Sequence, residues 1–130
     1  RPALEAGRVV LTDRYDLSTL AYQGGGRRIP LATIKTLNEF ATGGIRPHLY
    51  VLLDVGVDQS LARRPRGAGD RIEKEDVAFH ERVALAYRDL AESEPDVALI
   101  DGREEITGVF AVVWAALASR FPETFPPRKG

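Results

Sequence analysis

Apolar residues along the chain gather into short runs that alternate with longer stretches of helical spacing. Three short runs dense in Val, Leu and Ile predict buried strands, at 9–12, 49–53 and within 96–102. Each run is followed at once by polar residues or glycine. Strands that alternate with helices favour a parallel sheet with helices on both faces, so the pattern predicts an α/β fold in a single domain, 1–130.

Apolar residues that recur every three or four positions predict the helices between these strands. One helix would carry Leu17, Leu20 and Ala21 and end at the triple glycine, 24–26. Others are expected from 30 to 43, from 58 to 62, from 77 to 90 and from 106 to 121. Residues 1–7 resemble the end of a helix closed by Gly7, as in a fragment of a longer chain, and the proline-rich tail after 121 is expected to fray.

Composition narrows the class of protein. The chain has 130 residues, 44% hydrophobic and 28% charged, as in a soluble globular domain. Its net charge of −1 provides no general attraction to nucleic acid or an acidic membrane. No run is long enough to span a bilayer and no signal peptide is evident, so we expect a cytoplasmic protein. Cysteine is absent and only two histidines occur, which argues against a thiolate or histidine metal site.

In parallel sheets, ligands bind beyond the carboxyl ends of the strands, and polar residues follow all three predicted strands. They are Asp13 with Arg14, Asp54, and Asp101 with Gly102. An aspartate at such a position can hold hydrated Mg²⁺, and an adjacent arginine matches the geometry of phosphate. The simpler interpretation of Asp13 and Arg14 is a salt-bridged pair, and Asp54 could equally cap the next turn.

Two further groups suggest chemistry. Arg63, Arg64, Arg66 and Arg71 lie in the glycine-containing segment RRPRGAGDR, where a mobile loop could surround charge that builds up during phosphoryl transfer. A solvated basic turn is an equal alternative. Ser18, Thr19, Tyr22 and Gln23 would share one helix face and could bind the edge of a base and sugar, although a capped helix explains them as well.

Taken together, the stretches DRYDLSTLAYQGGGR, LNEFATGGIRPHLYVLLDV, DRIEKE and LIDG resemble the thymidylate kinase family of the P-loop NTPase superfamily. They occur in the family's order and span nearly the whole chain. The resemblance implies a partial P-loop NTPase three-layer sandwich, a parallel sheet flanked by helices. It also implies transfer of the ATP γ-phosphoryl group to dTMP with Mg²⁺, giving dTDP for dTTP synthesis.

The resemblance also implies residue roles. Arg14 would contact the phosphates of donor and acceptor, Asp13 would help to organise Mg²⁺, and Asp101–Gly102 would lie beside adenine. The thymidine pocket would be lined by Ser18, Thr19, Tyr22 and Gln23. The lid over ATP, about 63–72, would include the catalytic and ATP-binding arginines, Arg63, Arg64, Arg66 and Arg71.

One departure from the family pattern is large, because G-x-x-x-x-G-K-[ST] does not occur in these residues. In the family this P-loop lies upstream, together with the first strand, which would run between the strands ending at Asp13 and Asp54. We therefore expect a chain that lacks its first strand and P-loop and has no kinase activity alone. Those two strands would then lie about two strand spacings apart, roughly 10 Å, or the gap would be filled or narrowed.

Two alternatives remain open at this point. The parent protein could phosphorylate another acceptor, as a deoxynucleoside kinase or other nucleotide kinase does. The chain could instead be a non-catalytic interaction module that kept the fold and lost the P-loop. The family is usually dimeric, so a homodimer is expected, through the helix at 30–43 or the one at 77–90.

Overall fold

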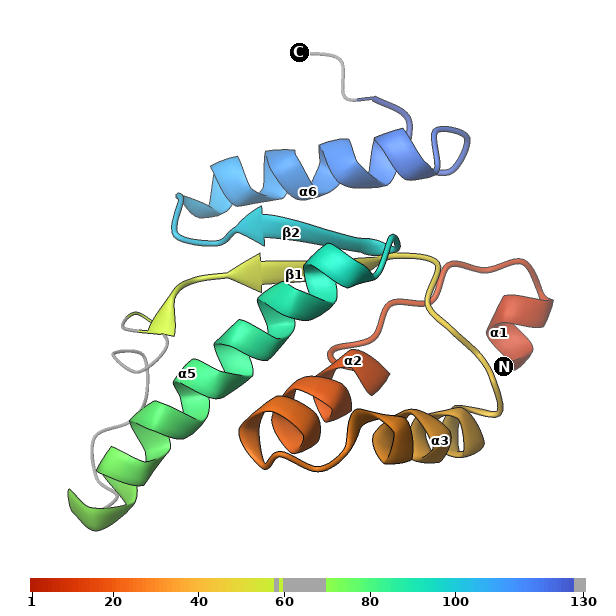
Figure 1. Ribbon diagram of the computed structural model, residues 1–130. Coiled ribbons are helices and arrows are strands. Elements are labelled where there is room, and N and C mark those ends of the chain that lie inside the picture. Colours follow the sequence, from red (N-terminus) through yellow and green to blue (C-terminus); the bar gives the residue numbers. More distant parts are fainter. Residues whose placement is uncertain (58, 60–69, 128–130) are drawn as a thin grey trace.

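The computed structural model describes residues 1–57, 59 and 70–127, with only the backbone described for 70–76. Its elements follow one another along the chain as Figure 1 shows. They are α1 (Pro2–Glu5), α2 (Asp16–Thr19), the π-helix η1 (Leu20–Gly26), α3 (Leu31–Thr42), β1 (Tyr50–Asp54), α5 (Asp70–Ser93), β2 (Val97–Asp101) and α6 (Ile106–Arg120).

The two strands pair in parallel and bring their carboxyl ends together. Tyr50 lies opposite Val97, and Asp54 lies opposite Asp101. The predictions at 49–53 and 96–102 are therefore confirmed to within one or two residues. The sheet lies between α6 and α5 (Figure 1), and this layering confirms the predicted fold class, a parallel sheet flanked by helices as in part of a P-loop NTPase sandwich.

The main core forms where α5 packs against η1 and α2, and α3 packs against η1 and α2 as well. Its buried side chains are Leu17, Leu20, Ala21, Ile34, Val83 and Leu90. Tyr50 and Val97 pack against this cluster from the strands. Because side chains alternate along a strand, Ile100 points to the other face of the sheet, where it is also buried. The sheet is thus covered on both faces along β2.

The helix predicted to end at the triple glycine does end there, but its second part, from Leu20, is the π-helix η1. Gly24, Gly25 and Gly26 form the last part of η1. A Cβ atom on Gly25 would collide with the side chain of Ala86 and lie 3.2 Å from the backbone oxygen of Arg82. A Cβ atom on Gly26 would likewise collide with the ring of Phe79. The glycines are therefore needed for close approach between two helices, a requirement that local sequence does not reveal.

The predicted strand at 9–12 is wrong. These residues adopt no regular structure, and Val9, Val10 and Leu11 are 61%, 51% and 90% exposed. Among the described residues, the sheet consists of β1 and β2 alone. An apolar run becomes a strand only when a neighbour satisfies its backbone groups, and the described part of the chain offers this run none.

Other boundaries were predicted with mixed success. The stop after α3 is confirmed, since Gly43 takes the left-handed conformation at φ 60°. Gly7 has φ 67° just after α1, as the predicted helix end at 1–7 requires. Helix α5 begins at Asp70, within the segment interpreted as a loop to Arg71. Most of the predicted helix at 58–62 lies outside the described residues.

The proline-rich tail is folded back on α6 and is not frayed as far as Pro126. The indole nitrogen of Trp114 donates to the backbone oxygen of Pro126 at 3.0 Å, and Phe125 packs edge-on against the Trp114 ring. A tail with an aromatic residue can anchor itself on an apolar helix, and the high proline content of the tail obscured this signal. In the described part of the chain, no helix is long and apolar enough to cross a membrane.

Candidate functional site

Arg14 occupies a strained position directly before α2. Its φ of 64° lies in the left-handed region, which is uncommon for a residue with a side chain. The side chain of Thr12 donates to the backbone oxygen of Arg14 at 3.2 Å and so helps to hold this turn. The guanidinium carbon lies 5.3 Å from the centre of the Tyr22 ring, within the range of a cation–π contact. Strain of this kind is often found at ligand sites.

Tyr22 is in turn held by aromatic residues of α5. Its ring makes edge-on contacts with Phe79 at 6.0 Å and Tyr87 at 6.4 Å between centroids. The Tyr87 hydroxyl donates to Ser18 Oγ at 2.8 Å. Five residues from three parts of the chain thus meet in what we call the tyrosine cluster: Arg14, Ser18, Tyr22, Phe79 and Tyr87.

Burial raises the pKa of the Tyr87 phenol, which stays protonated at neutral pH. The nearby positive charge of Arg14 acts in the opposite direction and does not reverse the shift. A protonated phenol can donate its hydrogen bond, which leaves the hydroxyl proton of Ser18 free to be directed elsewhere.

The structure brings together only some of the residues predicted for the thymidine pocket. Ser18 and Tyr22 meet through Tyr87, and both are half-buried. Thr19 is exposed, although it was predicted to share their face. Thr19 follows Ser18 within α2, and one α-helical step turns its side chain by about 100° from that of Ser18. Gln23 follows within η1 and is half-buried.

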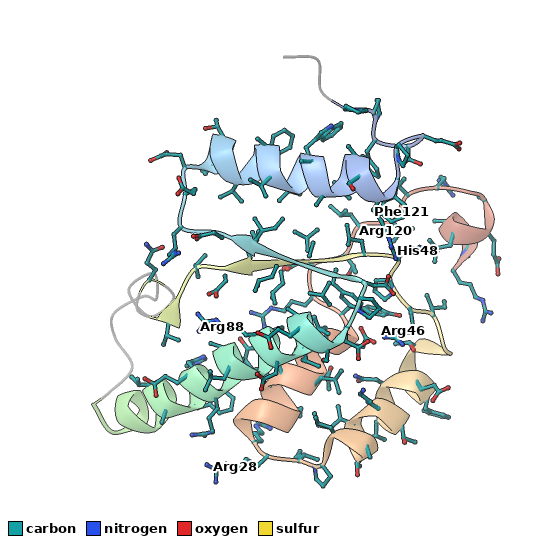
Figure 2. The ribbon with its side chains drawn as sticks, turned by 45° about the horizontal axis from the view of Figure 1, so that its top comes forward. Arg28, Arg46, His48, Arg88, Arg120 and Phe121 are labelled. Atoms are coloured by element: carbon teal, nitrogen blue, oxygen red, sulfur yellow. The ribbon has the colours of Figure 1, made fainter. Side chains whose placement is uncertain are left out.

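A second polar group lies at the carboxyl ends of the strands, where the sequence predicted one. Arg88 reaches from α5 toward β1 (Figure 2), and its Nε donates to Asp54 Oδ2 at 2.9 Å. The backbone N–H of Gly56 donates to Asp54 Oδ1 at 3.0 Å, which confirms that Asp54 caps the following turn. These two contacts lower the pKa of the Asp54 carboxyl.

The neighbouring turn after β2 is similarly organised. Arg103 donates from its backbone N–H and from Nε to Asp101 Oδ1, at 3.0 and 2.8 Å. Arg103 thereby lowers the pKa of Asp101 to about 2. The N–H of Gly102 donates to the backbone oxygen of Asp54 at 2.9 Å, so this predicted adenine-side donor is already used within the fold. Sequence reasoning missed Arg88 and Arg103, which only the paired strand ends bring together.

The structure describes the residues predicted for the lid and for the metal site only in part. Arg63, Arg64 and Arg66 lie outside the described residues, and Arg71 is described only as backbone in the first turn of α5. Asp13 is exposed beside Arg14 and does not follow a strand, since residues 9–12 adopt no regular structure. Among the described side chains, no three histidine, cysteine or acidic groups gather into a metal site. A single carboxylate still suits Mg²⁺ that arrives with nucleotide phosphates, because Mg²⁺ often takes only one or two protein ligands.

A separate cavity of about 280 Å³ lies between α3, the start of α2 and the end of α5. The Glu94 carboxylate forms ion pairs here with Lys35 and Arg46, at nitrogen–oxygen distances of 3.6 and 3.2 Å. The other residues that line the cavity are Asp16, Leu20, Asn38, Glu39, Thr42 and Gly44. None of the residues predicted from sequence to bind substrate lines it.

Comparison with known proteins identifies relatives along most of the chain. A family profile described as "Thymidylate kinase" matches residues 1–112. A thymidylate kinase of Enterococcus faecalis is 43% identical over 128 residues, covering 95% of this chain and 60% of the relative. One from Desulforudis audaxviator is 47% identical over 116 residues, covering 88% and 52%. The chain thus spans a little over half the length of these curated relatives.

Proposed function

Since the chain belongs to the thymidylate kinase family, we propose that it supplies the dTMP pocket and lid of an enzyme that transfers the γ-phosphoryl group of ATP to dTMP. The observation that carries this proposal is the tyrosine cluster. It combines a cation, a hydroxyl and an aromatic ring, which are the groups needed for a phosphate, a base edge and a sugar.

In this reaction a phosphate oxygen of dTMP attacks the γ-phosphorus of ATP, the bond to the β-phosphate oxygen breaks, and ADP leaves with that electron pair. Arg14 is well placed to offset negative charge, because its backbone is fixed and its side chain is supported by Tyr22. Bound Mg²⁺ would neutralise the charge on the ATP phosphates, with Asp13 as its protein carboxylate.

Further roles follow from the family and complete the proposal. Tyr22 would lie against the deoxyribose and disfavour a 2′-hydroxyl, with Ser18, Thr19 and Gln23 around the base. Arg63, Arg64, Arg66 and Arg71 would belong to a lid at about 63–72 that covers ATP and provides the catalytic arginine. Asp101 and Gly102 would lie beside the adenine.

The test is a coupled assay of ADP formation on the protein expressed from its complete reading frame. We expect turnover with ATP and dTMP that depends on Mg²⁺, and little turnover when thymidine replaces dTMP. Efficient use of thymidine would instead identify a nucleoside kinase, and no turnover with either would favour a non-catalytic module.

The same assay on the 130-residue chain alone is expected to show no ADP formation. No G-x-x-x-x-G-K-[ST] sequence occurs in these residues, and that sequence provides the backbone cradle and the lysine for the ATP phosphates. ADP formation by the purified 130-residue chain would contradict this part of the proposal.

A further inference from the structure

Aromatic side chains of α5 support the tyrosine cluster. Phe79 and Tyr87 are eight positions apart, so they share the face of α5 that meets η1. Both make edge-on contacts with the ring of Tyr22. The orientation of the Tyr22 ring is therefore fixed by α5, a helix that lies far from η1 in the sequence.

The backbones of η1 and α5 are close enough to make this support rigid. Gly25 lies against Ala86, Gly26 lies against Phe79, and a side chain at either glycine would collide. Arg82 Nε also donates to the backbone oxygen of Gly26 at 3.2 Å, which ties the end of η1 to α5. Small rotations of Tyr22 relative to α5 are opposed by these contacts, as expected for close-packed interiors.

The hydroxyl of Tyr87 adds a directional contact. It donates to Ser18 Oγ at 2.8 Å, and the Tyr87 side chain is half-buried. Because a serine hydroxyl has one proton and that bond uses Ser18 Oγ as acceptor, the Ser18 proton is available to a ligand oxygen or nitrogen. Ser18 is thereby prepared as a hydrogen-bond donor.

We propose that Tyr87 is a positioning residue of the dTMP pocket, which orients the Ser18 hydroxyl as a donor and supports the Tyr22 ring. This inference rests on the function proposed above. Tyr87 does not touch the nucleotide itself. It acts through Ser18 by its hydroxyl and through Tyr22 by its ring, so the two effects can be separated by substitution.

The test uses the protein from its complete reading frame. Tyr87→Phe keeps the ring and removes the hydroxyl, so KM for dTMP should rise about 3- to 10-fold, the range expected for one hydrogen bond, while KM for ATP stays unchanged. Tyr87→Leu removes the ring as well and should raise KM for dTMP further. An equal rise in both KM values, or no change in either, would overturn the inference.

A double-mutant cycle with Ser18→Ala shows whether Tyr87 acts through Ser18. If it does, Tyr87→Phe should change KM for dTMP less than 2-fold in the Ser18→Ala background. A full 3- to 10-fold effect in that background would contradict the proposed route.

Tyr15→Phe is the matched control, because Tyr15 also donates from a part-buried hydroxyl, to the backbone oxygen of Ile45 at 3.2 Å. It should lower the unfolding temperature as much as Tyr87→Phe does and leave KM for dTMP unchanged. An equal rise in KM for dTMP in Tyr15→Phe would reduce Tyr87 to a stabilising residue. Absence of dTMP turnover in the unsubstituted protein would refute the proposed function itself, a distinct result.

Discussion

The contact between η1 and α5 and the extended segment 9–12 differ in almost every physical respect. The first is glycine-rich and weakly apolar in sequence, yet its backbone lies so close to α5 that a Cβ atom on Gly25 or Gly26 would collide. The second is a run of Val, Val and Leu, yet those three side chains are more than half exposed. Apolar sequence shows that a segment would gain from burial, but whether it is buried depends on a partner of matching shape.

The partner of η1 is present in the same chain, because α5 carries Ala86 and Phe79 at the positions that face Gly25 and Gly26. For segment 9–12, the described residues provide no strand on the neighbouring edge of β1. The side chains of Val51 and Leu53 in β1 are also partly exposed, at 39% and 48%. The described residues thus contain the packing partner of η1 but no strand partner for segment 9–12.

The largest effect is expected from Gly25→Ala. The new Cβ atom would collide with Ala86 and force η1 away from α5, at a cost of about 1–3 kcal/mol in the free energy of unfolding. Denaturant unfolding followed by circular dichroism measures this change. The control is Gly108→Ala in α6, where the nearest atom would lie 3.8 Å from the new Cβ. It should stabilise the chain by about 0.5–1 kcal/mol through helix propensity, and equal losses in both variants would refute tight packing at Gly25.

A smaller effect is expected from the ion pair at the carboxyl end of β1. The pKa of Asp54 is lowered in the fold, so its ion pair with Arg88 contributes stability above about pH 4, the range of an unfolded aspartate. This contribution is lost as the pH falls through the lower folded pKa. Both side chains are partly exposed, at 29% and 46%, so it amounts to about 0.5–1 kcal/mol.

Asp54→Asn should therefore lower stability at pH 7 and make the unfolding free energy less steep below pH 4. Arg88→Gln should reduce the same slope, because it removes the largest cause of the shift. Thermal unfolding between pH 2 and 7 tests both variants. If the unfolding free energy of both variants fell with decreasing pH as steeply as in the unsubstituted chain, the end of β1 would be held no more firmly than segment 9–12.

The smallest effect is expected from Leu11→Ser, since the Leu11 side chain is 90% exposed. Its removal should change the free energy of unfolding of the 130-residue chain by less than about 0.5 kcal/mol, as for other surface positions. Denaturant unfolding provides the measurement. A loss of several kcal/mol would mean that segment 9–12 is packed in solution, and the contrast with η1 would then disappear.

Much of the fold could be predicted from the sequence. The two paired strands, α3 and α6 were located to within one or two residues, because their apolar periodicity matches a partner that the chain itself contains. The π-helix could not be predicted, since the reason for its glycines lies sixty residues away in α5. The strand at 9–12 was a wrong prediction for the converse reason, as its local signal was strong but the described residues contain no strand to pair with it.

The candidate site was only partly predictable. Ser18, Tyr22 and Arg14 carry recognisable chemistry in one short stretch, and the structure gathers them. Tyr87 resembled an ordinary inward-facing residue of an amphipathic helix, and no local pattern indicates its bond to Ser18. Thr19 was assigned to the same face, but one helical step of about 100° separates it from Ser18, and it is exposed. Local sequence patterns predict neither contacts between distant segments nor a change of helical pitch.

The open edge of β1 has a consequence for how this chain behaves in solution. Unpaired backbone groups beside exposed Val51 and Leu53 form a template on which the strand of another molecule can add. The net charge of −1 provides little electrostatic repulsion between molecules, and least near the isoelectric point of about 6.2. Colloidal stability should therefore fall with rising protein concentration and be poorest in mildly acidic buffer, so purification favours dilute, more alkaline conditions.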